Sequence, residues 1–154
     1  MDYRKEYEKW LASPALSEDE RAELRALEGN DKEIKARFYG PLEFGTAGLR
    51  GTMYTGLHNM NRHVIRWATQ GFANVIRAEG TEAMQKGVAV CMDCRNHSAE
   101  FARETACVMA ANGIHVRLFE SLRPTPELSF AVREYGCQAG VNVTASHNPK
   151  EYNG

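Results

Sequence analysis

The spacing of hydrophobic residues predicts helices at the start of the chain. Four large residues recur at helical spacing in the first turns: Tyr3, Tyr7, Trp10 and Leu11. A capping-box pattern, Ser17 with Glu20, opens a second helix to about residue 27, and a third is expected over residues 32–38. We interpret residues 1–40 as a helical amino-terminal extension packed on the domain that follows. Its aromatic stripe is more typical of a core than of a cofactor site.

Helical and strand-like segments alternate along the rest of the chain. Helices are predicted at 61–78, 98–112 and 127–134, and strands at 87–92, 114–118 and 139–143. Trp67 and Val75 are expected on the buried stripe of the first helix. The first of these strands is continuously apolar, which is typical of a strand buried on both faces, whereas the second alternates and is expected nearer an edge. The fold class is therefore α/β. We expect a layered α/β/α domain with a mixed or mostly parallel sheet over residues 41–154.

Composition and charge narrow the class of partner. The chain has 154 residues, of which 43% are hydrophobic, enough for the core of one domain. Its 19 basic and 20 acidic residues are dispersed, so we expect no nucleic-acid or membrane partner. No apolar stretch reaches transmembrane length, and the charged first residues do not resemble a signal peptide. A cytoplasmic location is expected.

The four cysteines include one Cys-x-x-Cys pair, Cys91 and Cys94. Such a pair is compatible with a redox couple or with half of a zinc site. Cys107 and Cys137 have no second ligand at metal spacing, so nothing supplies the other half. We expect reduced thiols, with Cys91 ending a buried strand.

A glycine-rich segment, residues 44–56, contains Arg50 among its four glycines. Glycines at this density allow main-chain N–H groups to approach a phosphate closely. The spacing fits neither the P-loop nor the dinucleotide-binding pattern. On spacing alone, a glycine-rich hairpin with a solvated arginine is favoured over a phosphate site.

The last segment presents a serine after a strand. Residues 139–143 lead into small and polar residues, where Ser146 stands between Ala145 and His147, and Pro149 stiffens the loop. A serine hydroxyl needs a base, a metal or an attached group to react. A hydrolase would require Gly-x-Ser-x-Gly, which is absent, and in an extended chain the His147 side chain would point away from Ser146. The hydrolase alternative is therefore disfavoured.

Two motifs carry a resemblance to a known family. Residues 140–149, Gly-Val-Asn-Val-Thr-Ala-Ser-His-Asn-Pro, resemble the phosphoserine signature of the α-D-phosphohexomutases, the family of phosphoglucomutase and phosphomannomutase. Residues 44–51, Phe-Gly-Thr-Ala-Gly-Leu-Arg-Gly, resemble its amino-terminal motif, and residues 37–42 are similar to the longer-headed branch that includes phosphopentomutases. Enzymes of this family are much longer. The resemblance implies an amino-terminal domain that ends inside the phosphoserine loop, with the remaining domains absent.

The resemblance implies a mutase mechanism. Ser146 would carry a phosphoryl group, donate it to a sugar phosphate and recover another from the bisphosphorylated sugar, which also acts as activator. The enzyme would interconvert a hexose 1-phosphate and a hexose 6-phosphate, and glucose is the first sugar expected. Arg50 would face the active site, which reverses the preference from spacing, and His147 would contact the ligand or relay a proton, unless it merely caps the loop. We expect Asp93 and Arg95 to pair and fix the loop.

The resemblance also implies what lies outside these residues. A phosphorylated Ser146 would bind Mg²⁺, whose other ligands belong to an Asp-Gly-Asp-x-Asp-Arg loop of a second domain. A proton-transferring lysine and the sugar-binding motifs are likewise absent, so the chain alone is not expected to turn over. Its partners would be the phosphosugar and the missing domains of its own chain. The alternative is a standalone phosphate-binding or regulatory module. The sequence leaves glucose, mannose and pentose phosphates open, and the oligomeric state as well.

Overall fold

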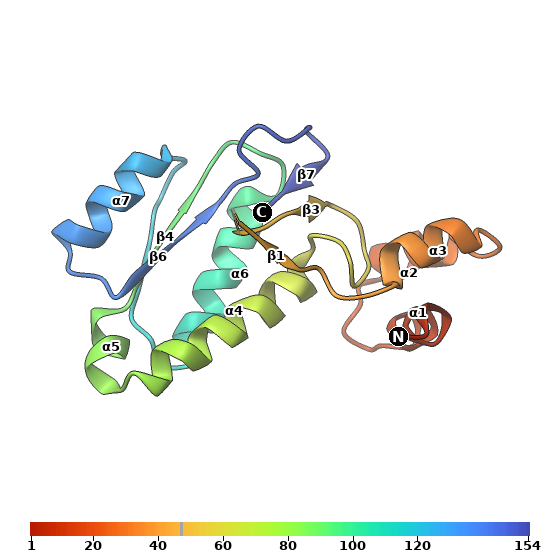
Figure 1. The fold of residues 1–154 in the computed structure, drawn as a ribbon, viewed down its shortest axis with the longest axis horizontal. Helices are drawn as coiled ribbons and strands as arrows, with labels where there is room; N and C mark the ends of the chain where they lie inside the picture. Colours follow the sequence, from red (N-terminus) through yellow and green to blue (C-terminus); the bar gives the residue numbers. More distant parts are fainter. Residues whose placement is uncertain (47) are drawn as a thin grey trace. The chain divides into compact units, whose positions relative to one another are not determined.

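The computed structural model describes residues 1–46 and 48–154. The chain forms two compact units, one of residues 1–61 with Gly154 and the other of residues 62–153, and each is described by itself (Figure 1). Within the described ranges, no helix is long and apolar enough to cross a membrane. The predicted boundary between domains near residue 40 stays a prediction.

Three short helices open the first unit, as predicted. They are α1 (Tyr3–Leu11), α2 (Glu18–Arg25) and α3 (Asp31–Phe38). The capping box of Ser17 and Glu20 is present: the Ser17 side chain accepts the Glu20 N–H, and the Glu20 carboxylate accepts the Ser17 N–H. Asn30 caps α3 through its side chain, so this helix begins one residue earlier than predicted.

The core of this unit is built around Phe38, which is fully buried. The rings of Tyr7 and Trp10 meet it edge-on, with centroids at 5.6 and 5.7 Å. Leu57, which lies beyond the helices in the sequence, belongs to the same core. The aromatic stripe is therefore core, as predicted. The other buried members are Leu16, Leu24, Leu27 and Ile34.

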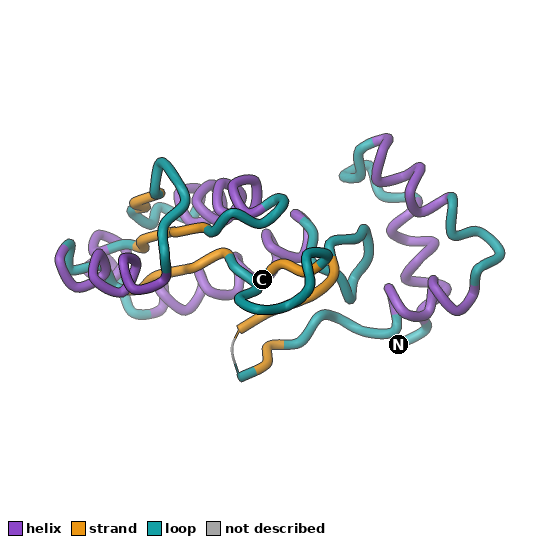
Figure 2. The backbone as a smooth tube through the Cα atoms, turned by 90° about the horizontal axis from the view of Figure 1, so that it is seen from above, coloured by secondary structure: helices purple, strands orange, loops and turns teal. Residues whose placement is uncertain are grey.

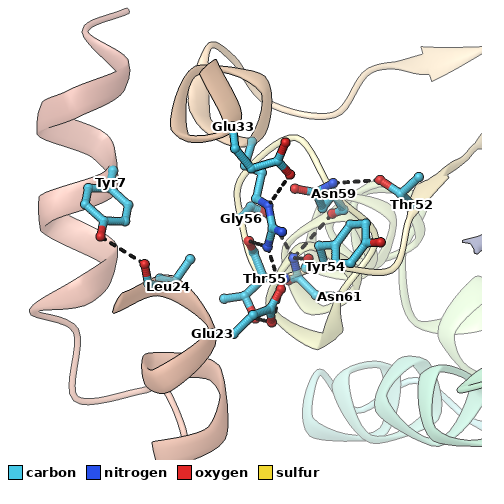
Figure 3. Close-up of polar contacts among 11 residues, drawn as sticks. Tyr7, Glu23, Leu24, Glu33, Thr52, Tyr54, Thr55, Gly56, Asn59 and Asn61 are labelled. Carbon is cyan, nitrogen blue, oxygen red and sulfur yellow. Dashed lines mark hydrogen bonds and ion pairs between the residues drawn. The ribbon is translucent and has the colours of Figure 1, made fainter. Parts of the chain in front are cut away.

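Arg37 joins these helices to the turn at residues 54–55, further along the chain. Figure 3 shows its partners Glu23 and Glu33, with Thr55 of that turn beside Glu23. Its side chain is only 9% exposed and forms ion pairs with Glu23 of α2 and Glu33 of α3, at 2.5 and 2.9 Å. Glu23 also accepts hydrogen bonds from the N–H and hydroxyl of Thr55. The guanidinium carbon lies 4.4 Å from the centre of the Tyr54 ring. One arginine therefore connects two helices and the turn at residues 54–55.

The glycine-rich segment forms a hairpin. Strand β1 (Phe44–Gly45) pairs antiparallel with β2 (Gly48–Leu49), so the hairpin favoured on spacing alone is present, with Arg50 directly after it. Ala47 lies outside the described residues. Strand β3 (Gly51–Thr52) follows directly.

The second unit contains a parallel three-stranded sheet. Strand β4 (Val88–Met92) lies between β5 (Val116–Leu118) and β6 (Ala139–Val143), and both pairs are parallel. Strand β4 is buried over almost its whole length, and β5 is an edge strand of this sheet. The predicted α/β fold class is confirmed, and of the two sheet types expected, mixed or mostly parallel, this sheet is parallel.

Helices cover both faces of this sheet (Figures 1 and 2). Ala89 and Cys91 of β4 pack with Leu128 of α7 (Thr125–Glu134). Because side chains alternate along a strand, Val88 and Val90 face the other side, where α6 (Ser98–Ala111) packs. Helix α4 (Arg62–Ala78) packs on α6. The unit is a layered α/β/α domain, as predicted.

Several details differ from the predictions. Trp67 and Val75 of α4 were expected in its buried stripe but are 60% and 56% exposed, because the buried stripe follows other positions. Helix α7 begins at Thr125 rather than 127, directly after the extended Pro124. A short helix, α5 (Thr81–Lys86), and a two-residue strand, β7 (Tyr152–Asn153), were not predicted.

Gly87 explains how the chain enters β4. Its φ is +71°, and a Cβ there would lie 2.1 Å from the carbonyl oxygen of His115. Only glycine fits this position.

All four cysteines are free thiols, as predicted, and burial raises the pKa of Cys91.

Candidate functional site

Ser146 lies on an exposed turn that follows β6. Its φ is +54°, in the left-handed region that residues other than glycine rarely adopt. The Ser146 N–H donates to Thr144 Oγ1 at 3.0 Å, and the Asn148 N–H donates to the Ala145 carbonyl at 3.0 Å. Ala145 is fully buried beneath the exposed serine. The turn therefore holds the backbone while it leaves the hydroxyl accessible.

His147 lies beside the serine hydroxyl. The distance from Ser146 Oγ to His147 Nδ1 is 3.3 Å, so the expectation that these side chains point apart is wrong. That expectation assumed an extended backbone, whereas the left-handed conformation of Ser146 brings the neighbours together. The contact is long for a hydrogen bond to a hydroxyl. Among the described residues His147 contacts the Ser146 hydroxyl and has no carboxylate partner, so a Ser-His-Asp triad is not assembled within them.

Arg95 binds the same loop from within. Its Nη1 donates to the carbonyl oxygens of Pro149 at 2.8 Å and Tyr152 at 3.0 Å. Its Nη2 donates to the carbonyl oxygens of Ser146 at 2.9 Å and Asn148 at 2.5 Å. The side chain is 14% exposed. Four carbonyl groups of the loop thus converge on one guanidinium.

Asp93 holds the base of the loop. One carboxylate oxygen accepts the Thr144 hydroxyl at 2.5 Å, and the other accepts the Ser98 hydroxyl at 2.7 Å and the Arg95 N–H at 3.0 Å. Burial alone would raise the pKa of Asp93. The hydrogen bonds from Thr144, Arg95 and Ser98, together with the Arg95 charge, outweigh this and lower the pKa below its ordinary value.

Asp93 and Arg95 therefore contact the loop largely by separate routes. Their closest side-chain contact is 3.8 Å, so the direct pair that was expected is loose. Sequence reasoning missed Thr144 and Asn153 as loop-holding residues. Asn153 is fully buried, and its amide donates to the Asn96 carbonyl at 2.9 Å and to Ser98 Oγ at 3.0 Å. The signal for Thr144 was available, because a threonine two residues before a loop N–H is typical of a side-chain turn.

Arg50 belongs to the first unit, between β2 and β3. Its side chain is half-buried. The following residue, Gly51, is closely packed, because a Cβ there would lie 3.1 Å from the Leu42 side chain and 3.2 Å from the Met60 nitrogen. The structure brings Ser146 and His147 together. The active-site role of Arg50 stays a prediction.

The described residues do not build a metal site by themselves. Among them, no group of three or more His, Cys, Asp or Glu could hold an ion. The Asp93 carboxylate is already engaged by three protein donors. The exposed Ser146 hydroxyl is a possible single oxygen ligand, whereas Mg²⁺ requires octahedral coordination.

Comparison with protein families places both sequence motifs within one match. The family model described as phosphoglucomutase/phosphomannomutase, alpha/beta/alpha domain I, matches residues 41–154. This range includes both Arg50 and Ser146.

Individual relatives agree with this match. A human phosphopentomutase is 41% identical over 133 residues, covering 82% of this chain and 22% of that protein. A Staphylococcus saprophyticus phosphoglucomutase is 41% identical over 124 residues, covering 80% of this chain and 22% of that protein. A crystal structure from Thermus thermophilus, provisionally described as a phosphomannomutase, superposes with a TM-score of 0.66 at 32% identity and covers 74% of this chain and 24% of that one. The chain thus spans 22% of the length of these curated relatives.

Proposed function

Because this chain belongs to the phosphoglucomutase/phosphomannomutase family, we propose that it carries the phosphoserine of a phosphosugar mutase, with Ser146 as the phosphoryl carrier. The observation that carries this proposal is the conformation of Ser146. Its hydroxyl is exposed on a turn whose backbone is held on both sides, by Thr144 and by Arg95. Phosphoryl transfer depends on positioning more than on covalent chemistry by the protein, and such a turn supplies positioning.

The proposed reaction moves one phosphoryl group out and another back. Phosphorylated Ser146 gives its phosphoryl group to a hydroxyl of the sugar phosphate, which leaves a free serine and a bisphosphorylated sugar. The other phosphate of that sugar then returns to Ser146 Oγ. His147 Nδ1, at 3.3 Å, supports a role in holding the proton of the free serine hydroxyl. The same sugar bisphosphate serves as activator, because it can phosphorylate a free serine.

We propose a hexose phosphate, glucose 1-phosphate first, as the substrate. Similarity to phosphoglucomutases supports this choice. Similarity to phosphopentomutases of equal identity keeps ribose 1-phosphate as the competing substrate. A cytoplasmic location stays a prediction of the sequence.

Arg50 and Mg²⁺ complete the proposal. The match of residues 44–51 to the family motif supports Arg50 as a ligand for phosphoryl oxygens, which a guanidinium suits. A bound Mg²⁺ would neutralise charge on the transferred group. Phosphorylated Ser146 would provide one of its oxygen ligands, and the others would come from outside the described residues.

The product of the full reading frame tests this proposal. We expect Ser146→Ala to lower turnover of glucose 1-phosphate on the order of 10⁴-fold or more, because the carrier oxygen is lost. Ser129→Ala, an exposed serine on α7, is the matched control and should leave turnover unchanged. A parallel assay with ribose 1-phosphate decides the substrate. Full turnover by Ser146→Ala would overturn the proposal, and binding without turnover in the unmodified protein would favour the phosphate-binding module.

A further inference from the structure

A largely buried cation lies behind the turn that presents Ser146. We propose that Arg95 is a positioning residue that holds Ser146 in its left-handed conformation and supplies positive charge to a phosphoryl group on it. This inference rests on the proposed function for the reaction and on the loop geometry for the mechanism. The two terminal nitrogens of Arg95 donate hydrogen bonds to four carbonyl oxygens of the loop, including that of Ser146.

The conformation of Ser146 needs external support. A non-glycine residue at φ +54° is disfavoured by contacts between its Cβ and its own backbone. Such residues persist when their surroundings fix them from several sides. Here the N–H of Ser146 is fixed by Thr144, which Asp93 holds, and its carbonyl oxygen is fixed by Arg95. Both peptide groups that define the turn are therefore anchored.

A lysine would not replace Arg95. The guanidinium is a flat fork whose two terminal nitrogens lie apart, and each serves two carbonyl oxygens. The ammonium of a lysine concentrates its donors at one point. A lysine at this position could keep the charge and one or two of these bonds, but the rest of the loop carbonyls would lose their partners. Charge and shape can thus be separated by one conservative substitution.

The same contacts favour an anion at Ser146. Carbonyl oxygens are the negative ends of peptide dipoles, and Arg95 directs those of Ser146 and Asn148 toward itself. Among the described residues, the carboxylate that contacts the Arg95 side chain is that of Asp93, at 3.8 Å. The hydroxyls of Ser98 and Thr144 and the backbone N–H of Arg95 already donate to it. Arg95 is therefore only loosely neutralised, and its charge remains available to a phosphorylated serine.

The test compares Arg95→Lys with Arg123→Lys in the product of the full reading frame. Arg123 is an exposed arginine paired with Glu127, so it serves as the matched control. We expect Arg95→Lys to lower kcat on the order of 10²-fold through misplacement of the serine, with KM for the sugar phosphate nearly unchanged. The control should keep both constants. An unchanged kcat in Arg95→Lys would overturn the proposal.

Hydrogen exchange followed by mass spectrometry separates local positioning from folding. In Arg95→Lys, exchange should accelerate in residues 144–153 and stay unchanged in β4 and β5. Faster exchange throughout residues 62–153 would contradict a local role, and so would an unchanged loop. If Ser146→Ala retained full turnover, the proposed function would fail while the exchange result would still decide the loop mechanism. If Ser146→Ala were inactive and Arg95→Lys fully active, only the positioning proposal would fail.

Discussion

Two largely buried arginines in this protein are satisfied by different kinds of partner. Arg37, 9% exposed, meets the carboxylates of Glu23 and Glu33, which come from two helices. Arg95, 14% exposed, meets backbone carbonyls of one loop, with its closest carboxylate contact at 3.8 Å. The first arginine is neutralised by its partners. The charge of the second is only weakly compensated by a carboxylate, and its N–H donors fix the conformation of the loop backbone.

This difference in partners gives the two arginines different expected roles, one in stability and one in the proposed chemistry. A cation paired with two carboxylates connects the elements that carry them. Removing it lowers the stability of the fold, because the carboxylates lose their partner. A cation bound by carbonyls arranges a backbone and remains attractive to an anion. Arg37 is therefore expected to matter for folding of the first unit, and Arg95 for presentation of Ser146.

The largest stability effect should follow removal of Arg37. We expect Arg37→Met to lower the free energy of unfolding by about 3 kcal/mol, the low end for a broken buried pair, because Glu23 and Glu33 are 36% and 40% exposed. Urea unfolding followed by fluorescence measures this. Arg4→Met, which removes the exposed pair with Asp31, should cost far less. Equal losses would mean that Arg37 is no more than a surface ion pair.

The next largest loss of stability should follow substitution of Gly56, a glycine that packs against Arg37. Gly56 has φ +149°, and a Cβ there would lie 2.9 Å from both Arg37 Cβ and Asn59 Oδ1. We expect Gly56→Ala to lower the free energy of unfolding by about 2 kcal/mol through strain and displacement of Arg37. Gly29→Ala, at φ +83° with open space around it, should cost about 1 kcal/mol from the backbone alone. The same urea experiment compares them, and equal costs would contradict close packing at Gly56.

The Asp93 carboxylate should give the loop a pH dependence. Its pKa is lowered in the folded protein, so its contribution is present above the ordinary value of about 3.9 and is lost as pH falls through the folded pKa. Asp93→Asn should cost about 1.5 kcal/mol at pH 7, as for a hydrogen-bonded charged group. The stability difference between the two proteins, measured from pH 7 down to the acid range, should shrink below the ordinary pKa. A constant difference would show that the charge of Asp93 does not stabilise the fold.

The smallest loss of stability is expected for two threonines that make matching hydrogen bonds in the two regions. Thr55 donates its hydroxyl to Glu23 in the Arg37 cluster, and Thr144 donates to Asp93 in the loop, each at 2.5 Å. Each change to valine should cost about 1 kcal/mol of stability. Only Thr144→Val should also lower kcat in the product of the full reading frame, because it releases the Ser146 N–H. Equal kcat values for the two variants would break the distinction between the two regions.

The order of helices and strands could be predicted because local patterns determine it. The continuous apolar run of β4 indicates a buried strand, and the Ser17 capping box marks the start of α2. Trp67 was misplaced because a hydrophobic residue on a helix need not face the core, and about half of a protein surface is apolar anyway.

The site could be predicted only in part, because its geometry depends on distant residues. The serine and histidine were found from the loop sequence and its resemblance. The left-handed conformation of Ser146 was not, since it depends on Arg95, fifty-one positions away in the chain. The sequence did not indicate the buried ion pairs of Arg37 either, because a charged residue on a short helix is usually solvated.

Mass spectrometry of the product of the full reading frame tests the central claim most directly. The protein is incubated with a sugar bisphosphate, digested, and the peptide that contains Ser146 is sequenced. The account predicts one phosphate on Ser146, which disappears when excess sugar monophosphate is added and removes it in turnover. Turnover by a protein that never carries phosphate on Ser146 would contradict the account.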